Sequence, residues 1–271
     1  MVLEDIIKTI GVITAIKEEA KYFYAKRSFA KQTLFSRDFY LSVENNTRII
    51  LVHSHPGPVN SSATAESLII NFSPDFIINT GSAGSHDIEI LPGDVVIGDR
   101  YTINYNIEDV EQGKIKEKKG SLIRFIKNNK KKSFDYLEPD EYLLRLAQEL
   151  SSEVYLERID VLDFYASNAV PRDPRIFCAG IGSEDHWTVD AELIEKKKSF
   201  FGHRIEDKES AYIAQICHFH DVPFLSIRGV SDNELLERTI GHEAVYKRIE
   251  SCSINAAKLV VKVIEKIGKD I

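Results

Sequence analysis

Acidic side chains follow the apolar runs of this sequence at positions where they could act on a ligand. Glu19 comes soon after the run at 10–16, and Asp232 follows the run at 223–230. If these runs are parallel strands, their carboxyl ends meet at one sheet edge, where open α/β sheets bind ligands. Trp187, the only tryptophan, follows a third run. Carboxylates beside an aromatic ring suit an uncharged or cationic ligand that itself contains a ring. The alternative for each acid is a role in capping a helix.

The segment FIINTGSAGS at 76–85 combines an apolar run with the smallest side chains of the chain. Gly81 and Gly84 remove the Cβ and permit backbone conformations that other residues avoid. We therefore predict a loop here that lines a ligand crevice, with a purely steric βα turn as the alternative. The segment is neither a GxGxxG fingerprint nor a GK[ST] phosphate loop.

The remaining pattern alternates apolar runs with helical segments. Strands are predicted at 10–16, 75–81 and 223–230, among others, and a long helix is predicted from about 243 to 267. Such alternation indicates an α/β fold with a mostly parallel sheet. The stretch at 114–132 is strongly basic, which favours a solvated insertion over a contact with an anionic partner.

Composition excludes several classes of protein. The 271 residues carry a net charge of −7, which disfavours a nucleic-acid binder. No apolar run is long enough to span a membrane, and the first residues lack the basic region of a signal peptide. We therefore expect a cytoplasmic protein. Cys178, Cys217 and Cys252 are far apart and form no CxxC pair, so free thiols are expected.

Several segments together resemble the nucleoside phosphorylase/nucleosidase superfamily, and most closely its 5′-methylthioadenosine/S-adenosylhomocysteine nucleosidase branch. The matching segments occur in the family's order and are IGVITAIKEEA, PDFIINTGSAGS, PGDVVIGD, DKESAYIAQIC and VPFLSIRGVSDN. The resemblance implies a single α/β domain over 1–271, with a central mixed, partly barrel-like sheet flanked by helices. It also implies a homodimer with a nucleoside substrate and no cofactor. The basic insertion would occupy about 104–140.

The resemblance also implies roles for individual residues. Glu19 matches the acid that activates water, and Asp232 matches the acid that protonates purine N7. Glu209 matches the carboxylate that binds the ribose hydroxyls, and Ser82 matches a serine near the ribose and the water. Trp187 lies where the family stacks an aromatic ring on the base, and the backbone beside it would read the base edge.

These residue types suit the cleavage of an N-glycosidic bond. The reaction develops positive charge on the sugar and negative charge on the departing purine. Protonation of N7 by Asp232 would make the leaving group neutral, if burial raises its pKa. Carboxylates near the sugar stabilise an oxocarbenium-like transition state. An ionised Glu209 only accepts hydrogen bonds, so it can hold two hydroxyl groups.

Two departures from the family pattern affect the sugar end of the pocket. Lys208 stands where the family has methionine, and the SGIG turn is replaced by SHPG at 54–57. We therefore expect Lys208 to belong to the substrate site, and both changes leave the identity of the nucleoside open.

Water is the expected nucleophile, because the first loop carries Glu18 and Glu19 where the phosphorylases have glycine and arginine. Phosphate beside two carboxylates would be repelled. Arg228 could bind an anion or pair with a neighbouring carboxylate. A phosphorylase and a non-catalytic nucleoside-binding protein remain the alternatives. The eight histidines have no recognisable metal-ligand spacing, so no metal is expected.

Overall fold

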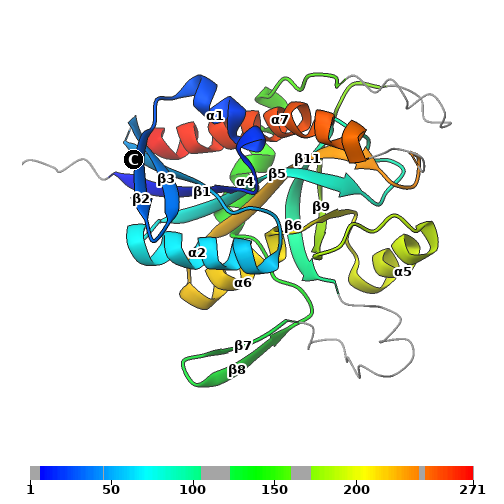
Figure 1. Cartoon of the computed structure of the whole chain (residues 1–271), viewed down its shortest axis with the longest axis horizontal. Helices are drawn as coiled ribbons and strands as arrows, with labels where there is room; N and C mark the ends of the chain where they lie inside the picture. The colour runs from blue at the N-terminus through cyan, green and yellow to red at the C-terminus, as the bar shows by residue number, and fades with distance from the viewer. Residues whose placement is uncertain (1–6, 45, 105–122, 160–171, 238–241, 271) are drawn as a thin grey trace, which may run out of the picture.

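The structure is a computed structural model that describes residues 7–44, 46–104, 123–159, 172–237 and 242–270 (Figure 1). In chain order the elements are β1 (Lys8–Thr14), the 3₁₀ helix η1 (Lys17–Ala20), α1 (Lys21–Lys26), β2 (Ala30–Leu34), β3 (Arg37–Glu44), β4 (Thr47–His53), α2 (Pro58–Phe72), β5 (Phe76–Ser85), β6 (Val95–Ile103), β7 (Ile123–Lys127), β8 (Lys130–Phe134), α4 (Glu141–Leu150), η2 (Ser151–Glu153), β9 (Ile176–Ser183), α5 (Ala191–Phe201), β10 (Ile205–Asp207), α6 (Ser210–His220), β11 (Phe224–Asn233) and α7 (His242–Lys269).

Nine strands form one mixed sheet in the order β10-β9-β6-β11-β5-β1-β4-β3-β2. The short strand β10 also pairs with β5, so β5, β11, β6, β9 and β10 close into a ring. Parallel pairs predominate around β1 and β5, while β6 runs antiparallel to β11. The predicted mixed, partly barrel-like sheet is therefore confirmed.

Both faces of the sheet are buried, and helices cover each face. Along β1, Ile10 and Val12 point to one core while Ile13 points to the other. The first core is completed by α4 and α7, and the second by α2 and α6, which lie on opposite sides of the strands (Figure 1). Two-sided burial explains why these strands are continuous apolar runs with no polar alternation.

The strand β5 is longer than its sequence predicts. The segment Gly81–Ser85, which we expected to form a loop, continues the strand and pairs with β11. Its last residues also pair with β10. A strand with a neighbour on each side satisfies its backbone groups by pairing, which overrides the weak strand preference of glycine. For the same reason β11 continues through Asp232 to Asn233.

The basic insertion is described only in part, because residues 105–122 lie outside the described ranges. Its described portion forms the hairpin β7–β8, which projects from the body of the molecule (Figure 1). Lys127 anchors the hairpin to the end of α6 through the carbonyl of His218 and the side chain of Asp221. Among the described helices, none combines the length and apolar character that crossing a membrane requires.

Candidate active site

A cavity of about 320 Å³ opens where β5, β10 and β11 end beside η1 and α7. The residues that line it include every site residue predicted from the sequence, together with others that were not predicted. The lining consists of Ala15, Ile16, Glu19, Pro56, Ser82, Ala83, Gly84, His86, His186, Trp187, Glu206, Asp207, Lys208, Glu209, Ser231, Asp232, Val245, Tyr246 and Ile249. The predicted residues therefore meet in one place although they span more than 200 positions.

Glu19 is a buried carboxylate held by four hydrogen-bond donors. Its Oε2 accepts from the backbone N–H of Ala15 at 2.7 Å and of Ile16 at 3.3 Å. Its Oε1 accepts from both the N–H and the hydroxyl of Ser82, each at 2.9 Å. Gly81 makes this approach possible, because a Cβ there would lie 2.5 Å from Oε1. The arrangement fixes the Glu19 carboxyl group at the wall of the cavity.

Asp232 lies in a different environment. Its Oδ1 accepts from the hydroxyl of Ser231. Its buried Oδ2 accepts no hydrogen bond from the described residues, and the carboxyl group lies in hydrogen-bonding contact with that of Glu234. Burial raises the pKa of Asp232 to about 8, and the neighbouring Glu234 and Glu237 carboxylates act in the same direction. A carboxyl group of this pKa is protonated at neutral pH and can donate its proton to a ligand.

Glu209 is the residue that precedes α6, and it belongs to a buried ion-pair network. Its Oε1 accepts from the N–H of Gly57 at 3.3 Å, and its Oε2 contacts Arg228 Nη2 at 3.1 Å. Burial raises the pKa of Glu209 to about 7, while Arg228 opposes the shift. Arg228 is fully buried and also contacts Asp207 at 2.8 Å. Of the two roles considered for Arg228, the structure therefore gives it that of a structural partner for carboxylates.

The other predicted residues take different positions around the cavity. Ser82 contacts Glu19, as described, and Trp187 is half-buried with a side-chain hydrogen bond to Glu234. Lys208 lines the cavity and is half-buried between Asp207 and Glu209 in the chain. Pro56 of the unusual SHPG turn also lines the cavity, so both departures from the family pattern lie at this site.

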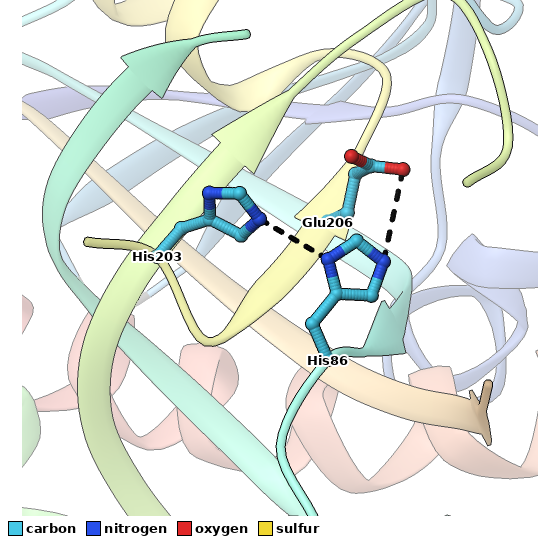
Figure 2. A group of neighbouring side chains, drawn as sticks. All are labelled: His86, His203 and Glu206. Carbon is cyan, nitrogen blue, oxygen red and sulfur yellow. Dashed lines mark hydrogen bonds and ion pairs between the residues drawn. The ribbon is translucent and has the colours of Figure 1, made fainter. Parts of the chain in front are cut away.

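A cluster of two histidines and one carboxylate borders the cavity (Figure 2). His86 Nδ1 lies 3.1 Å from His203 Nε2, and His86 Nε2 lies 3.9 Å from Glu206 Oε1. Burial lowers the pKa of His86 to about 3 and holds the pKa of His203 well below its usual value, so both rings are neutral. Neutral imidazoles and a carboxylate are suitable metal ligands, and one ligand atom of each lies within 4.8 Å of the others.

Sequence spacing gave no sign of this cluster, because His86 and His203 are 117 positions apart. Glu206 was also missed, although it lies three residues before Glu209 and faces the same cavity. Its signal would have been an acid in the short segment RIEDKES, where Lys208 and Glu209 were already candidate site residues. Val245 and Ile249 of α7 were missed as pocket residues because their spacing is that of any buried helix face.

Comparison with known proteins gives a consistent result. The model of the Phosphorylase superfamily matches residues 9–265. A 5′-methylthioadenosine/S-adenosylhomocysteine nucleosidase of Halalkalibacterium halodurans is 28% identical, covering 96% of this chain and 99% of the relative. The nucleosidase of Bacillus subtilis with the same name is 27% identical, covering 95% of this chain and 99% of that relative.

Among solved structures, the futalosine hydrolase of Helicobacter pylori superposes with a TM-score of 0.75 at 20% identity, covering 96% of this chain and 98% of that one. At such identity the superposition supports the fold alone. The match to the superfamily model, which extends over nearly the whole chain, shows that this protein belongs to the Phosphorylase superfamily.

Proposed function

We propose that the protein hydrolyses the N-glycosidic bond of a purine nucleoside, releasing the base. The observation that carries this proposal is the convergence of Glu19, Glu209 and Asp232 on one cavity, each in a distinct environment. The names of the relatives make 5′-methylthioadenosine and S-adenosylhomocysteine the first substrates to test.

In the proposed reaction, Asp232 donates its proton to the purine. Its raised pKa keeps the carboxyl group protonated at neutral pH, and its unpartnered Oδ2 faces Gly84 at the cavity wall. Proton transfer to N7 neutralises the leaving group as the bond breaks. General acid catalysis of this kind contributes roughly 10²- to 10⁴-fold to the rate.

At the sugar end, Glu19 orients and activates the attacking water. The Ser82 hydroxyl is the rotatable donor among its four partners, so it can turn to share Glu19 Oε1 with a water molecule. Ionised Glu19 also stabilises the positive charge that develops on the sugar. Glu209 then accepts hydrogen bonds from the ribose hydroxyls through oxygens that Gly57 and Arg228 hold in place.

Water is favoured over phosphate as the nucleophile because the sugar end carries carboxylates. Glu19 and Glu209 both line this part of the cavity, and the buried Arg228 is engaged with Asp207 and Glu209. A phosphate dianion would have to overcome like-charge repulsion from both carboxylates. Lys208 remains a predicted substrate contact at this end.

The test is to incubate the purified protein with 5′-methylthioadenosine, S-adenosylhomocysteine, adenosine and inosine, with and without phosphate, and to follow the released base. We expect release at a rate that phosphate does not change. Release that requires phosphate would indicate a phosphorylase. Tight nucleoside binding without release would indicate a binding protein of the same fold.

We further infer that the protein acts as a homodimer in the cytoplasm, as the family resemblance implies. Light scattering of the purified protein should give about twice the chain mass of 30.8 kDa. A mass equal to that of one chain would contradict the dimer.

A further inference from the structure

Two carboxyl side chains flank one glycine across the sheet at the cavity. Gly84 of β5 pairs with Asp232 of β11 on one side and with Glu206 of β10 on the other. Paired residues of neighbouring strands direct their side chains to the same face of a sheet. Asp232 follows this rule, since a Cβ at Gly84 would lie 2.9 Å from its Oδ2. The two carboxyl groups therefore border a slot whose floor has no side chain.

The width of this slot suits a two-ring base. Neighbouring strands lie about 4.8 Å apart, so two steps across a sheet that closes into a ring separate the backbones of Asp232 and Glu206 by less than about 10 Å. A purine that accepts one hydrogen bond from Asp232 at N7 presents its opposite edge, which contains N1, towards β10. Both carboxyl residues line the cavity, so both are within reach of a bound base.

The surroundings of Glu206 keep it an acceptor. Its Oε1 accepts from the N–H of Thr188 at 3.1 Å, and its Oε2 accepts from the Thr188 hydroxyl and from Asn104 Nδ2, each at 3.1 Å. The ammonium group of Lys197 lies 3.7 Å from Oε2. Burial raises the pKa of Glu206, while Lys197, Thr188 and Asn104, which donate to it, oppose this shift. Oε1 retains a lone pair that a ligand N–H can use.

The same contacts occupy a backbone donor next to the cavity. Thr188 follows the cavity residue Trp187, and its N–H donates to Glu206 Oε1. An edge of the base that reaches β10 therefore meets the carboxylate of Glu206, beside which this N–H is already engaged.

We propose that Glu206 is a specificity-determining residue that reads the N1 edge of the base and selects 6-oxopurines over adenine. In hypoxanthine and guanine N1 carries a hydrogen, which can be donated to Glu206. In adenine N1 is an acceptor, and placing it against a buried carboxylate leaves both groups unpaired. This inference rests on the proposed cleavage of a purine nucleoside, but it departs in the base from the substrates for which the relatives are named.

A metal ion is a weaker explanation of the same cluster. His86 lies between the other two side chains and faces His203 and Glu206 with different ring nitrogens (Figure 2). One ion cannot bind both of these nitrogens of His86. Lys197 also contacts Glu184 and Glu206, and so already supplies a cation to the carboxylates. The neutral His86 instead lies beside Glu206 and is held by His203.

The experiment compares pairs of nucleosides that differ only in the base, namely inosine with adenosine, and 5′-methylthioinosine with 5′-methylthioadenosine. We expect the kcat/KM of the wild-type protein to favour the 6-oxopurine member of each pair about tenfold or more. In Glu206→Gln the amide can donate to adenine N1, so the ratio should shift towards adenine by about tenfold or more.

The matched control is Glu184→Gln, which removes the other carboxylate of Lys197 from a position outside the cavity lining. It should leave the base ratio unchanged. A wild-type preference for adenine, or an unchanged ratio in a folded Glu206→Gln variant, would overturn the proposal.

Binding of the free bases to the wild-type protein, measured by calorimetry, keeps the test independent of the variant's folding and of turnover. Hypoxanthine should bind more tightly than adenine, and the reverse order would refute the role of Glu206. If no nucleoside is cleaved, the proposed hydrolysis fails, while the base preference is still decided by this measurement.

Discussion

At the residue scale, two carboxyl groups of the same site, those of Glu19 and Asp232, have different hydrogen-bonding environments. Glu19 accepts four hydrogen bonds, whereas Asp232 has one oxygen with no partner among the described residues. Four donors surround the Glu19 carboxyl group, while burial favours the neutral form of Asp232. One pocket thus contains two carboxyl groups in opposite environments.

Replacing Asp232 by asparagine should remove most turnover while leaving the fold intact. The amide keeps the shape and the hydrogen-bonding capacity of the protonated side chain, but it cannot transfer a proton to N7. We expect kcat to fall roughly 10²- to 10⁴-fold, measured by base release and accompanied by circular dichroism. Asp173→Asn, at an exposed ion pair with Arg158, serves as the control. Near-normal rates in Asp232→Asn would mean that another group is the acid.

The rate of base release should also decrease with rising pH, because Asp232 must be protonated. The carboxyl group must be protonated to act, and its pKa is raised to about 8. Values of kcat measured from pH 6 upwards should therefore decline as the pH passes through about 8. A rate that rises through this range would show that the ionised form is the active one.

Trp187→Ala should weaken substrate binding. If the indole stacks on the base, its loss costs about 1 to 3 kcal/mol, which raises KM about 5- to 150-fold. Trp187→Phe retains an aromatic face and should recover most of the affinity. An unchanged KM in the alanine variant would indicate that the ring only packs against its neighbours.

At the scale of elements, β5 brings the site together because it pairs with β11 along its length and with β10 at its end. Its glycines give two carboxyl groups access to the strand backbone. A Cβ at Gly81 would meet Glu19, and a Cβ at Gly84 would meet Asp232. The small side chains of this segment therefore make room for the reactive groups of other elements.

Gly81→Ala should impair both stability and activity. The new Cβ would lie 2.5 Å from Glu19 Oε1, and Gly81 has a φ of +152° that favours glycine. We expect a loss of about 1 to 3 kcal/mol in the free energy of unfolding, together with a strong decrease in kcat. Gly202→Ala is the matched control, because it has a φ of +75° at the end of α5 but no neighbour closer than 3.9 Å. It should lose stability alone, and equal kcat losses in both variants would contradict the role of Gly81.

Much of the sheet and of the site could be predicted from the sequence. The parts that could not be predicted depend on contacts between strands that are distant in the sequence. Continuous apolar runs located β1, the first half of β5 and most of β11, because both faces of these strands are buried. The second half of β5 could not be recognised as a strand, since glycine and serine have low strand preference and only its neighbours hold it. Glu206 and His86 were missed because contacts between residues on different strands produce no recognisable spacing along the sequence.

At the scale of the whole molecule, the two helical layers bury a set of ionisable groups whose titration affects stability. Burial raises the pKa of Asp232 to about 8 and that of Glu209 to about 7. Burial also lowers the pKa of His53 to about 4 and that of His86 to about 3. These two kinds of shift act on stability in different pH ranges.

Stability should therefore decrease as the pH rises from about 6.5 to about 8. In this range the folded protein retains a proton on Asp232 that the unfolded chain has lost, so raising the pH favours unfolding. The histidines lower the stability below pH 6.5, where the unfolded chain binds protons that the buried rings do not. We expect a loss of about 2 kcal/mol, or about 5 °C in Tm, measured by thermal unfolding.

Asp232→Asn provides the internal comparison for this measurement, because it removes the group with the higher pKa. Its Tm should change less over the same range of pH. A wild-type Tm that increases towards pH 8 would show that these carboxyl groups are ionised in the folded protein.

The position of Gly84 between two strands separates what the enzyme does from what it selects. Asp232 lies on one neighbouring strand and is the proposed acid of bond cleavage, whereas Glu206 lies on the other and is proposed to meet only the far edge of the base. Substitutions on β10 can therefore change which base is preferred, in evolution or in engineering, without changing the residues proposed to cleave the bond. Relatives that share this backbone could diverge in substrate through a single codon.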